Sequence, residues 1–172
     1  VKGGYAFSSD IFSSVGAPVI RIGDIKTDGS ISLESCKFIP TELAKSSQAY
    51  LVEKGQLLMA MTGATIGKAG VYVNDSPAYL NQRVGKFFLG EKPLKKLPFI
   101  YNALKQNKIS ETIINKGQGS AQPNISSNDI ESIEIPYSSN ILIKKFNETC
   151  YPLLYQIIHN QKQNMELTQL RD

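Results

Sequence analysis

The sequence is poor in the residues from which catalytic and metal sites are most often built. Its 172 residues include one histidine, His159, and two cysteines, Cys36 and Cys150, which are far apart and have no CxxC spacing. Because zinc sites need clustered cysteine and histidine ligands, the sequence predicts no metal site. Two isolated thiols favour buried, reduced cysteines in a cytoplasmic protein over a disulfide.

Motifs of several enzyme classes are absent as well. No Ser/His/Asp or Cys/His set can be assembled, and no pair of carboxylates is followed by the lysine of a nuclease. Gly63-Ala64-Thr65-Ile66-Gly67-Lys68 is one residue short of a phosphate loop, and Ala69 stands where a magnesium-binding Ser or Thr would be. Asp75-Ser76-Pro77-Ala78-Tyr79 is not the Asn/Asp-Pro-Pro-aromatic run of an amino-methyltransferase. The sequence therefore predicts a binding protein with no catalytic residues.

Long hydrophobic runs are also missing. The longest apolar stretches, such as Leu57 to Met61, are far too short to span a membrane, and no signal peptide is visible. The composition, 41% hydrophobic and 20% charged, is typical of a soluble globular protein, and the length suits one domain plus an appendage. Because the chain begins at Val1 and not at Met, we expect a fragment of something longer.

Positive charge is unevenly spread along the chain. The net charge is +4, but the stretch from Arg83 to Lys116 holds eight basic and two acidic residues, a balance of +6. Charge concentrated in one part of a chain favours a polyanionic partner. The alternative is a lysine-rich face that is simply solvated.

The chain up to Pro136 predicts an α+β domain. Short apolar or alternating segments favour strands, and Leu97 to Asn115 has helical periodicity that is interrupted near Asn107. This order of elements predicts a mixed, mainly antiparallel twisted sheet with short helices. The predicted strands are Val19–Ile25, Ile31–Leu33, Leu57–Met61, Val71–Val73, Leu80–Leu89 and Ile133–Ile135, with a turn at Lys26–Ser30 and a short helix or turn at Pro40–Ser47.

A glycine-rich loop separates this domain from the rest of the chain. The stretch from Gly117 to Pro123 cannot be the interior of a helix, because it combines two glycines with a proline. Its small polar side chains form hydrogen bonds and do not titrate, so the loop can read chemical groups but cannot move protons. Ser126 to Asp129 then offers side chains that can cap a helix.

After Pro136 the apolar residues repeat at the 3,4 spacing of a helix that pairs with another helix. A helix from about Asn140 to Asp172 would be about 50 Å long, with a kink or a new helix at Pro152. Leu154, Ile158 and Met165 broaden the apolar face, so the alternative is a helix folded back on its own domain. We favour pairing and predict a dimer through these pairing positions: Ile143, Phe146, Cys150, Leu153, Ile157, Asn160, Asn164 and Leu167.

Several segments, in this order, resemble the target recognition domain of the DNA specificity subunit of type I restriction–modification systems. They are Gly3–Phe7, Val19–Ile25 with Asp28–Ile31, Gly55–Leu58 with Thr62–Gly67, Tyr79–Arg83, Gly119–Ser126, Ile133–Pro136 and Leu167–Asp172. One departure concerns the start of the helix, where many members have Pro-x-x-x-Gln but Pro136 is followed here by Tyr137-Ser138-Ser139-Asn140-Ile141.

The resemblance implies a DNA-binding domain over residues 1–138 and a conserved helical spacer over residues 139–172. In that family two such units, usually in one chain, pack their helices antiparallel, and each reads half of a bipartite site in double-stranded DNA. The methyltransferase subunit, which binds S-adenosylmethionine, and the restriction subunit are separate chains. We therefore expect no cofactor on this chain, which is either a fragment or a half-length subunit that dimerises.

Contacts with DNA would divide between phosphates and bases. Lys and Arg bind phosphates, Gln and Asn can bridge the edge of adenine, and Arg can bridge guanine. Asn81 and Asn124 have the alternative role of tying loops together. The predicted contact residues are Thr62, Lys68, Asn81, Gln82, Arg83, Lys116, Gln118, Ser120 and Gln122.

Two other functions stay open at this point. A nucleic-acid-cleaving domain would need Asp and Glu residues that converge on a metal in a basic cleft. A protein-interaction domain would use the helical arm alone, with the lysines solvating one face.

Overall fold

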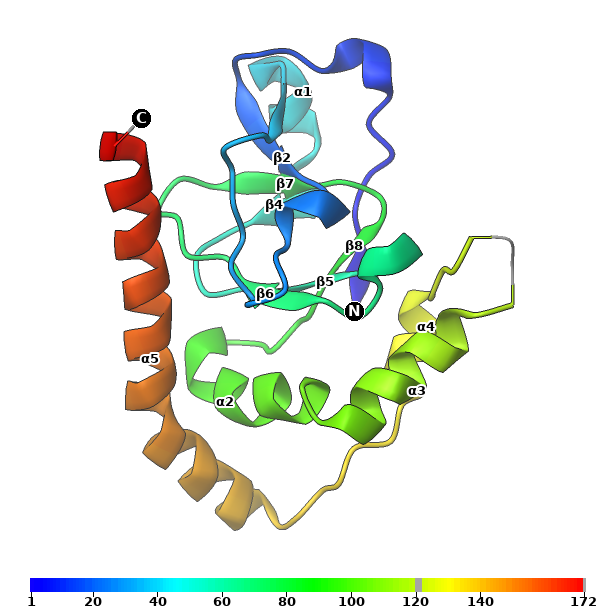
Figure 1. The fold of residues 1–172 in the computed structure, drawn as a ribbon, viewed down its shortest axis with the longest axis vertical. Coiled ribbons are helices and arrows are strands. Elements are labelled where there is room, and N and C mark those ends of the chain that lie inside the picture. The colour runs from blue at the N-terminus through cyan, green and yellow to red at the C-terminus, as the bar shows by residue number, and fades with distance from the viewer. Residues whose placement is uncertain (120–121, 172) are drawn as a thin grey trace.

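The computed structural model describes residues 1–119 and 122–171, which form two four-stranded sheets and several helices (Figure 1). The first sheet is antiparallel throughout and has the order β1 (Lys2–Gly3), β8 (Val84–Lys86), β5 (Leu57–Ala60) and β6 (Ala69–Val71). The second has the order β3 (Lys37–Ile39), β2 (Ala17–Ile20), β7 (Ala78–Leu80) and β4 (Leu51–Val52), with β2 and β7 parallel. The predicted α+β class with a mainly antiparallel sheet is confirmed.

Strand β5 is the centre of the core, which confirms the buried strand predicted there. All four of its residues are buried, because its two faces meet different apolar clusters. Leu58 and Ala60 pack in the cluster between the sheets, while Leu57 and Met59 face the helices. The alternation of side chains along a strand explains why an uninterrupted apolar run is needed at this position.

Two of the predicted strands are shorter than expected. Strand β2 ends at Ile20, and Ile22–Asp24 forms the 3-10 turn η2, in which the Asp24 carboxylate accepts a hydrogen bond from the Arg21 amide at 2.8 Å. The Lys26–Ser30 turn is confirmed by the Lys26 N–H donating to the Ser30 carbonyl at 2.9 Å. The predicted strand at Ile31–Leu33 is wrong, since it amounts to one bridge between Ile25 and Ile31.

The predicted strand Leu80–Leu89 is also wrong in one respect. The chain turns at residues 81–83, so that β7 and β8 belong to different sheets. The predicted strand Val71–Val73 shares only Val71 with β6, which ends there. The predicted strand Ile133–Ile135 is wrong, because this segment has no strand structure. Ile133 and Ile135 instead pack, half-buried, against the cluster that contains Met59 and Ile113.

The helices follow the predicted pattern more closely. Helix α2 (Pro93–Leu104) and helix α3 (Asn107–Gly117) are separated by two residues, which confirms the interruption near Asn107. The predicted short helix is α1 (Thr41–Ser46), although Pro40 and not Thr41 occupies its cap position. The remaining short helices are α4 (Ser127–Glu131) and the 3-10 turns η1 (Ser9–Ile11), η3 (Gln48–Tyr50) and η4 (Gly63–Thr65). Figure 1 shows α2 and α3 as a layer beneath the sheets.

Helix α5 (Asn140–Arg171) is one continuous helix of 32 residues that contains Pro152. A new helix beginning at Pro152, one of the two predicted outcomes, is therefore wrong. Figure 1 shows the axis of α5 bending in its lower part. The other predicted outcome, a kink, accounts for this bend, because Pro152 has no N–H for the carbonyl one turn earlier.

The inner face of α5 packs on the body of its own chain. Leu154 and Ile158, each 6% exposed, join Leu57, Leu97 and Tyr101 in one apolar cluster. Asn147 is also buried, and its Oδ1 accepts a hydrogen bond from the Phe99 amide at 2.8 Å. For this face, the alternative of a helix folded back on its own domain holds.

The outer face of α5 is exposed. Leu153 is 68%, Ile157 50% and Leu167 63% exposed, and Phe146 is exposed as well. Of the other predicted pairing positions, Asn160 and Asn164 are exposed, whereas Ile143 and Cys150 are half-buried at the border of the two faces. The helix thus has one apolar face toward its body and a second toward solvent.

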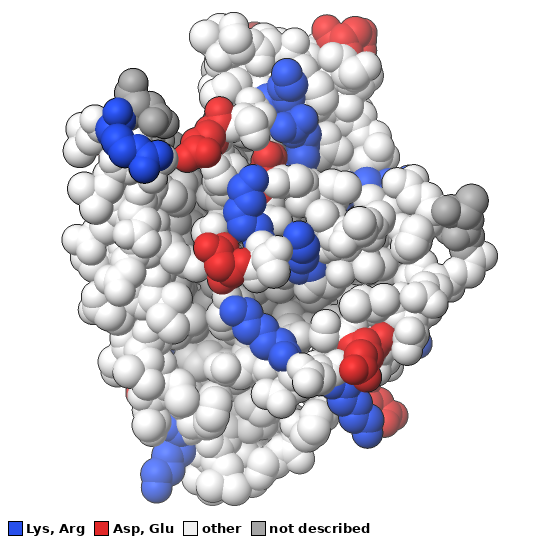
Figure 2. Space-filling model, viewed as in Figure 1, with Lys and Arg blue, Asp and Glu red and all other residues white. Residues whose placement is uncertain are grey.

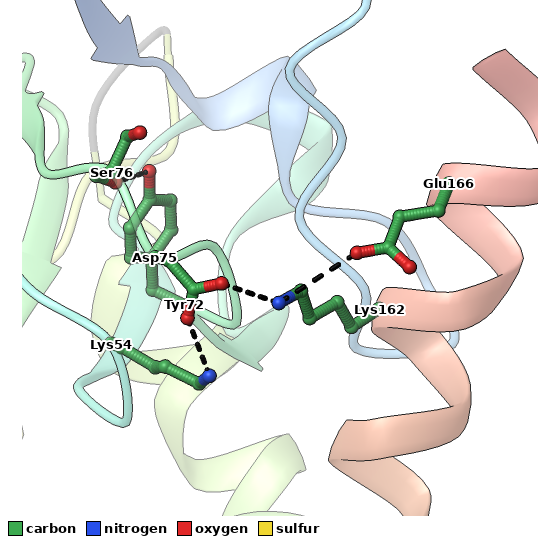
Figure 3. Close-up of polar contacts among 6 residues, drawn as sticks. All are labelled: Lys54, Tyr72, Asp75, Ser76, Lys162 and Glu166. Atoms are coloured by element: carbon green, nitrogen blue, oxygen red, sulfur yellow. Dashed lines mark hydrogen bonds and ion pairs between the residues drawn. The ribbon is translucent and has the colours of Figure 1, made fainter.

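An ion-pair cluster fastens the second half of α5 to the body (Figure 3). The Lys162 ammonium contacts Asp75, whose other oxygen lies 2.6 Å from Lys54 Nζ, and Glu166 lies 3.7 Å from Lys162. The turn that carries Asp75 is itself anchored, because the buried Tyr72 hydroxyl donates to the Ser76 carbonyl at 2.7 Å.

Of the helices that the structure describes, α5 included, none carries an apolar stretch of the length that a bilayer crossing requires. Cys36 is buried and Cys150 half-buried, and neither is in a disulfide.

Candidate nucleic-acid interface

Three loops that are distant in sequence meet at one edge of the molecule, and we call residues 62–68, 81–83, 116–119 and 122–124 the loop cluster. The Thr62 hydroxyl and the Gly63 N–H both donate to the Pro123 carbonyl at 2.8 Å. The Met61 N–H donates to the Arg83 carbonyl at 2.9 Å, which holds the second loop beside the first. Figure 1 shows η4 and the connection between α3 and α4 on the same side of the molecule.

The third loop is closed where Gly117 and Asn124 meet, and we call this point the neck. The Asn124 N–H donates to the Gly117 carbonyl at 2.8 Å, so the two ends of the loop touch. Arg83 Nη1 donates to Asn124 Oδ1 at 3.1 Å and ties the neck to the second loop. Gly119 has a φ of 138°, which a residue with a Cβ adopts only under strain. Side chains between the two ends therefore project from a fixed base.

The predicted contact residues do not share one environment. The side chains that are exposed at the loop cluster are those of Gln82, Arg83, Lys116, Gln118 and Gln122, while Lys68 and Asn81 are half-buried. Thr62 is 4% exposed and its hydroxyl is bonded to Pro123, so it supports the loop from below. The prediction for Ser120 lies outside the described residues.

Asn124 ties the neck to the second loop, whereas the side-chain bond of Asn81 is local. Asn81 Oδ1 accepts a hydrogen bond from the Gln82 amide at 2.7 Å, and Asn124 is bonded on both sides of the neck. Tyr5 is missing from the predicted contact residues. It forms a β-bridge with Asn81 and is 45% exposed next to the second loop. An aromatic residue directly after two glycines is the signal that could have identified it.

The exit from the loop cluster is a capped helix, as predicted. The Ser126 hydroxyl accepts a hydrogen bond from the Asp129 N–H at 3.1 Å, and the Asp129 carboxylate accepts from the Ser126 N–H and hydroxyl. These bonds from Ser126 lower the pKa of Asp129, and the nearby Lys116 lowers it further. A carboxylate held in this way fixes the direction in which the chain leaves the neck.

The basic stretch from Arg83 to Lys116 does not form one patch. Arg83 and Lys116 lie at the loop cluster, but Lys86 is buried and donates to the Leu51 carbonyl at 2.5 Å, and burial lowers its pKa. Lys95 and Lys96 line a cavity of about 500 Å³ against the first turns of α5. Figure 2 shows positive and negative side chains interleaved over the visible face. Of the eight basic residues in this stretch only Lys86 is buried, and the others are spread over the loop cluster and along α2 and α3.

Acidic residues give no sign of a catalytic metal site within the described ranges. Among residues 1–119 and 122–171, no three His, Cys, Asp or Glu side chains lie close enough together to hold a metal ion. Among the described residues, the exposed polar side chains of the loop cluster carry amides, one guanidinium and one ammonium. Such groups form hydrogen bonds and bind anions.

Comparison with known proteins gives a consistent result. The model of the family described as "Type I restriction modification DNA specificity domain" matches residues 1–140. Among curated proteins, the chain is 25% identical over 140 residues to the type I restriction enzyme MjaVIII specificity subunit of Methanocaldococcus jannaschii. That alignment covers 79% of this chain and 32% of the relative.

Solved structures share the fold. The crystal structure of a type I restriction–modification S subunit from M. genitalium matches 99% of the chain with a TM-score of 0.59 at 19% identity. A chain from a structural study of complex assembly and conformational transition of the type I R-M system matches 99% with a TM-score of 0.54 at 13% identity. The present chain spans 40% and 39% of those two chains, so it is well under half their length.

Proposed function

Because the chain belongs to the family of type I restriction–modification DNA specificity domains, we propose that it recognises one half of a bipartite DNA target. In this proposal it is a non-catalytic part of a cytoplasmic specificity subunit. It positions a methyltransferase subunit, which carries the S-adenosylmethionine, and a restriction subunit joins the same assembly. The chain itself binds no cofactor.

The observation that carries the proposal is the convergence of the loop cluster. Three segments that are distant in the sequence meet at one edge, where the second presents Gln82 and the third Gln118 and Gln122, with Arg83 and Lys116 beside them. Amide side chains suit base edges, and the two cations suit phosphates. Discrimination by this unit would come from base contacts and DNA shape, while the two cations add affinity that carries no sequence information.

The arm has a separate role in the proposal. We propose that the outer face of α5, with Leu153, Ile157 and Leu167, packs against the arm of a second recognition unit. That unit is either a second part of a longer chain or a second copy of this chain. Apolar side chains at 3,4 spacing that find no partner in their own body support this role.

Methylation mapping in cells that carry the intact system tests the recognition proposal. We expect one methylated sequence that consists of two half-sites. Removal of residues 1–138 should abolish the recognition of one half-site, and with it methylation of the bipartite sequence. Purified assembly should bind the mapped duplex. Failure to shift any DNA at low salt, with the methyltransferase present, would instead favour the protein-interaction alternative.

The salt dependence of binding tests the two cations. In the Arg83→Ala, Lys116→Ala double variant, we expect weaker binding and a slope of log K against log salt that falls by about 0.9 for each lost phosphate contact. A Lys144→Ala, Lys145→Ala double variant removes the same charge from the start of α5 and should leave the slope unchanged. Equal slopes for the wild type and the Arg83/Lys116 variant would contradict the interface.

Light scattering tests the arm. The wild-type chain should form a dimer at high concentration, and Leu153→Lys with Ile157→Lys should give a monomer with unchanged helix content. A monomeric wild type at the highest concentrations would contradict pairing between copies.

A further inference from the structure

We propose that Arg83 and Asn124 form a positioning pair, which braces the closed neck of the third loop against the second loop so that Gln118 and Gln122 face the DNA in a fixed arrangement. The proposal rests on the proposed function and deepens it. By residue type, Arg83 would be expected to read guanine and Asn124 to read adenine. The geometry assigns both to holding the loop that reads, and the guanidinium of Arg83, which has five N–H donors, can bind a phosphate at the same time.

Each member of the pair is engaged on two sides. The Arg83 carbonyl accepts from the Met61 N–H at 2.9 Å, while its Nη1 donates to Asn124 Oδ1 at 3.1 Å. The Asn124 N–H donates to the Gly117 carbonyl at 2.8 Å. Arg83 thus connects the strand end at β8 to the point where the third loop closes.

The rest of the neck is held through the backbone. The Pro123 carbonyl accepts from both the Thr62 hydroxyl and the Gly63 N–H, and the Ile125 N–H donates to the Met61 carbonyl at 2.9 Å. These contacts survive most side-chain substitutions. The bond between Arg83 and Asn124 joins two exposed side chains, so it can be removed without disturbing the core, and the neck is then held by its backbone contacts alone.

The brace matters because it orders the base of the loop before DNA binds. The loop contains Gly119 in a conformation that favours glycine, and a Cβ at Gly63 would lie 3.9 Å from the Gln122 amide nitrogen. A loop that is ordered before binding loses less conformational entropy on the DNA. Loss of the Arg83–Asn124 bond should therefore weaken base recognition by Gln118 and Gln122 together.

This role makes a prediction that direct base reading does not. Removing either partner breaks the same bond, so Arg83→Ala, Asn124→Leu and the double variant should have the same effect, without additivity. Asn124→Asp keeps the acceptor oxygen and pairs it with the guanidinium, so it should preserve the neck. Lys116→Ala is the matched control, since it removes one positive charge from the start of the same loop.

The first test measures hydrogen exchange of peptides that cover residues 117–126, in the assembly without DNA. Arg83→Ala and Asn124→Leu should each speed exchange of the Asn124 and Ile125 amides by about tenfold, and the double variant by no more. Asn124→Asp and Lys116→Ala should exchange as the wild type does. Unchanged exchange in both single variants overturns the proposal, whatever the DNA result.

The second test maps methylation and binding for the same variants. Arg83→Ala and Asn124→Leu should each reduce sequence specificity at the same base positions and weaken binding of the mapped duplex by about tenfold. The double variant should have the same effect. If Arg83→Ala alone relaxes a single guanine position and Asn124→Leu changes nothing, Arg83 reads that base and the proposal is wrong. A wild type with no sequence-specific methylation would refute the proposed function but leave the exchange result standing.

Folding of each variant is checked by thermal unfolding. If Arg83→Ala unfolds, Arg83→Gln replaces it in both tests, because glutamine keeps an exposed polar side chain but is too short to reach Asn124. Additive effects of the two substitutions, with either Arg83 variant, would also overturn the pair.

Discussion

The loop cluster and the junction of α5 with the body are fastened to the same sheets by different forces. At the loop cluster, the anchors are hydrogen bonds that mostly end on backbone atoms, such as the Pro123 and Gly117 carbonyls. At the junction, the anchors are buried side chains, among them Leu154 and Ile158, with an ion pair from Lys162 at the edge. One region is held by its backbone and the other by its side chains.

The difference determines which substitutions each region tolerates. Apart from the pair Arg83 and Asn124, exposed side chains on a loop with backbone anchors can change without moving the loop, which would suit the proposed reading of different targets. On α5, each inner position is tied to a pocket in the body, so sequence change is confined to the outer face. Because the two faces alternate along the helix, neighbouring residues should respond in opposite ways.

The largest effect is expected on the inner face of α5. Leu154→Ala removes a side chain that is 6% exposed and leaves a cavity beside Leu97, so the free energy of unfolding should fall by about 3 kcal/mol. Leu153→Ala changes a neighbour that is 68% exposed and should cost less than about 0.5 kcal/mol at concentrations where the chain is monomeric. Urea unfolding measures both. Equal losses would contradict the division of α5 into two faces.

A smaller effect is expected where the backbone of the N-terminal segment passes the second loop. A Cβ at Gly4 would lie 2.2 Å from the Asn81 carbonyl oxygen and 2.4 Å from that of Leu80, and backbone atoms cannot move aside as a side chain can. Gly4→Ala should therefore lower the free energy of unfolding by about 1–3 kcal/mol and displace the turn at residues 81–83.

Gly3→Ala is the control for that change. Its added Cβ would meet its nearest atom, the Gln82 carbonyl oxygen, at an ordinary 3.6 Å. We expect nearly wild-type stability and DNA binding from Gly3→Ala. If Gly4→Ala is equally neutral in urea unfolding, the loop cluster does not depend on its backbone contacts in the way described.

Sequence patterns predicted the parts of this fold that depend on local chemistry. The break between α2 and α3, the buried β5, the cap at Ser126 and the 3,4 spacing of α5 all follow from side chains within a few residues of each other. The patterns failed where distant contacts decide. Residues 80–89 read as one strand, because periodicity does not show that β7 and β8 join different sheets.

The candidate site was predicted less well, for a related reason. The residue types in the three loops were identified, but not the partners that make Thr62 a support and tie Arg83 to Asn124. Likewise, a count of lysines along the chain says nothing of the direction in which each one points. Lys86 points into the body and Lys95 lines the cavity against α5, so the balance of +6 in sequence is not gathered at the loop cluster alone.

The smallest effect concerns the charged contact at the edge of the α5 junction. Contacts with Lys162, and then with Lys54, lower the pKa of Asp75 from 3.8 to about 2, and the pKa of Lys162 is raised mainly by Asp75. A lowered carboxyl pKa stabilises the folded state above about pH 4, and this contribution is lost as the pH falls toward 2. The raised lysine pKa gives a contribution that is present below pH 10.5 and is lost above the folded-state value.

Asp75→Asn should therefore lower the melting temperature slightly at pH 7, and the difference from the wild type should vanish near pH 2. Because the groups are exposed, high salt should also reduce the difference. Glu166→Gln, which affects a longer contact of 3.7 Å to Lys162, should have a weaker effect with the same trend in salt. A melting-temperature difference for Asp75→Asn that persists unchanged at pH 2 would mean that Asp75 acts through packing, and the junction would then be held by side-chain shape without a charged component.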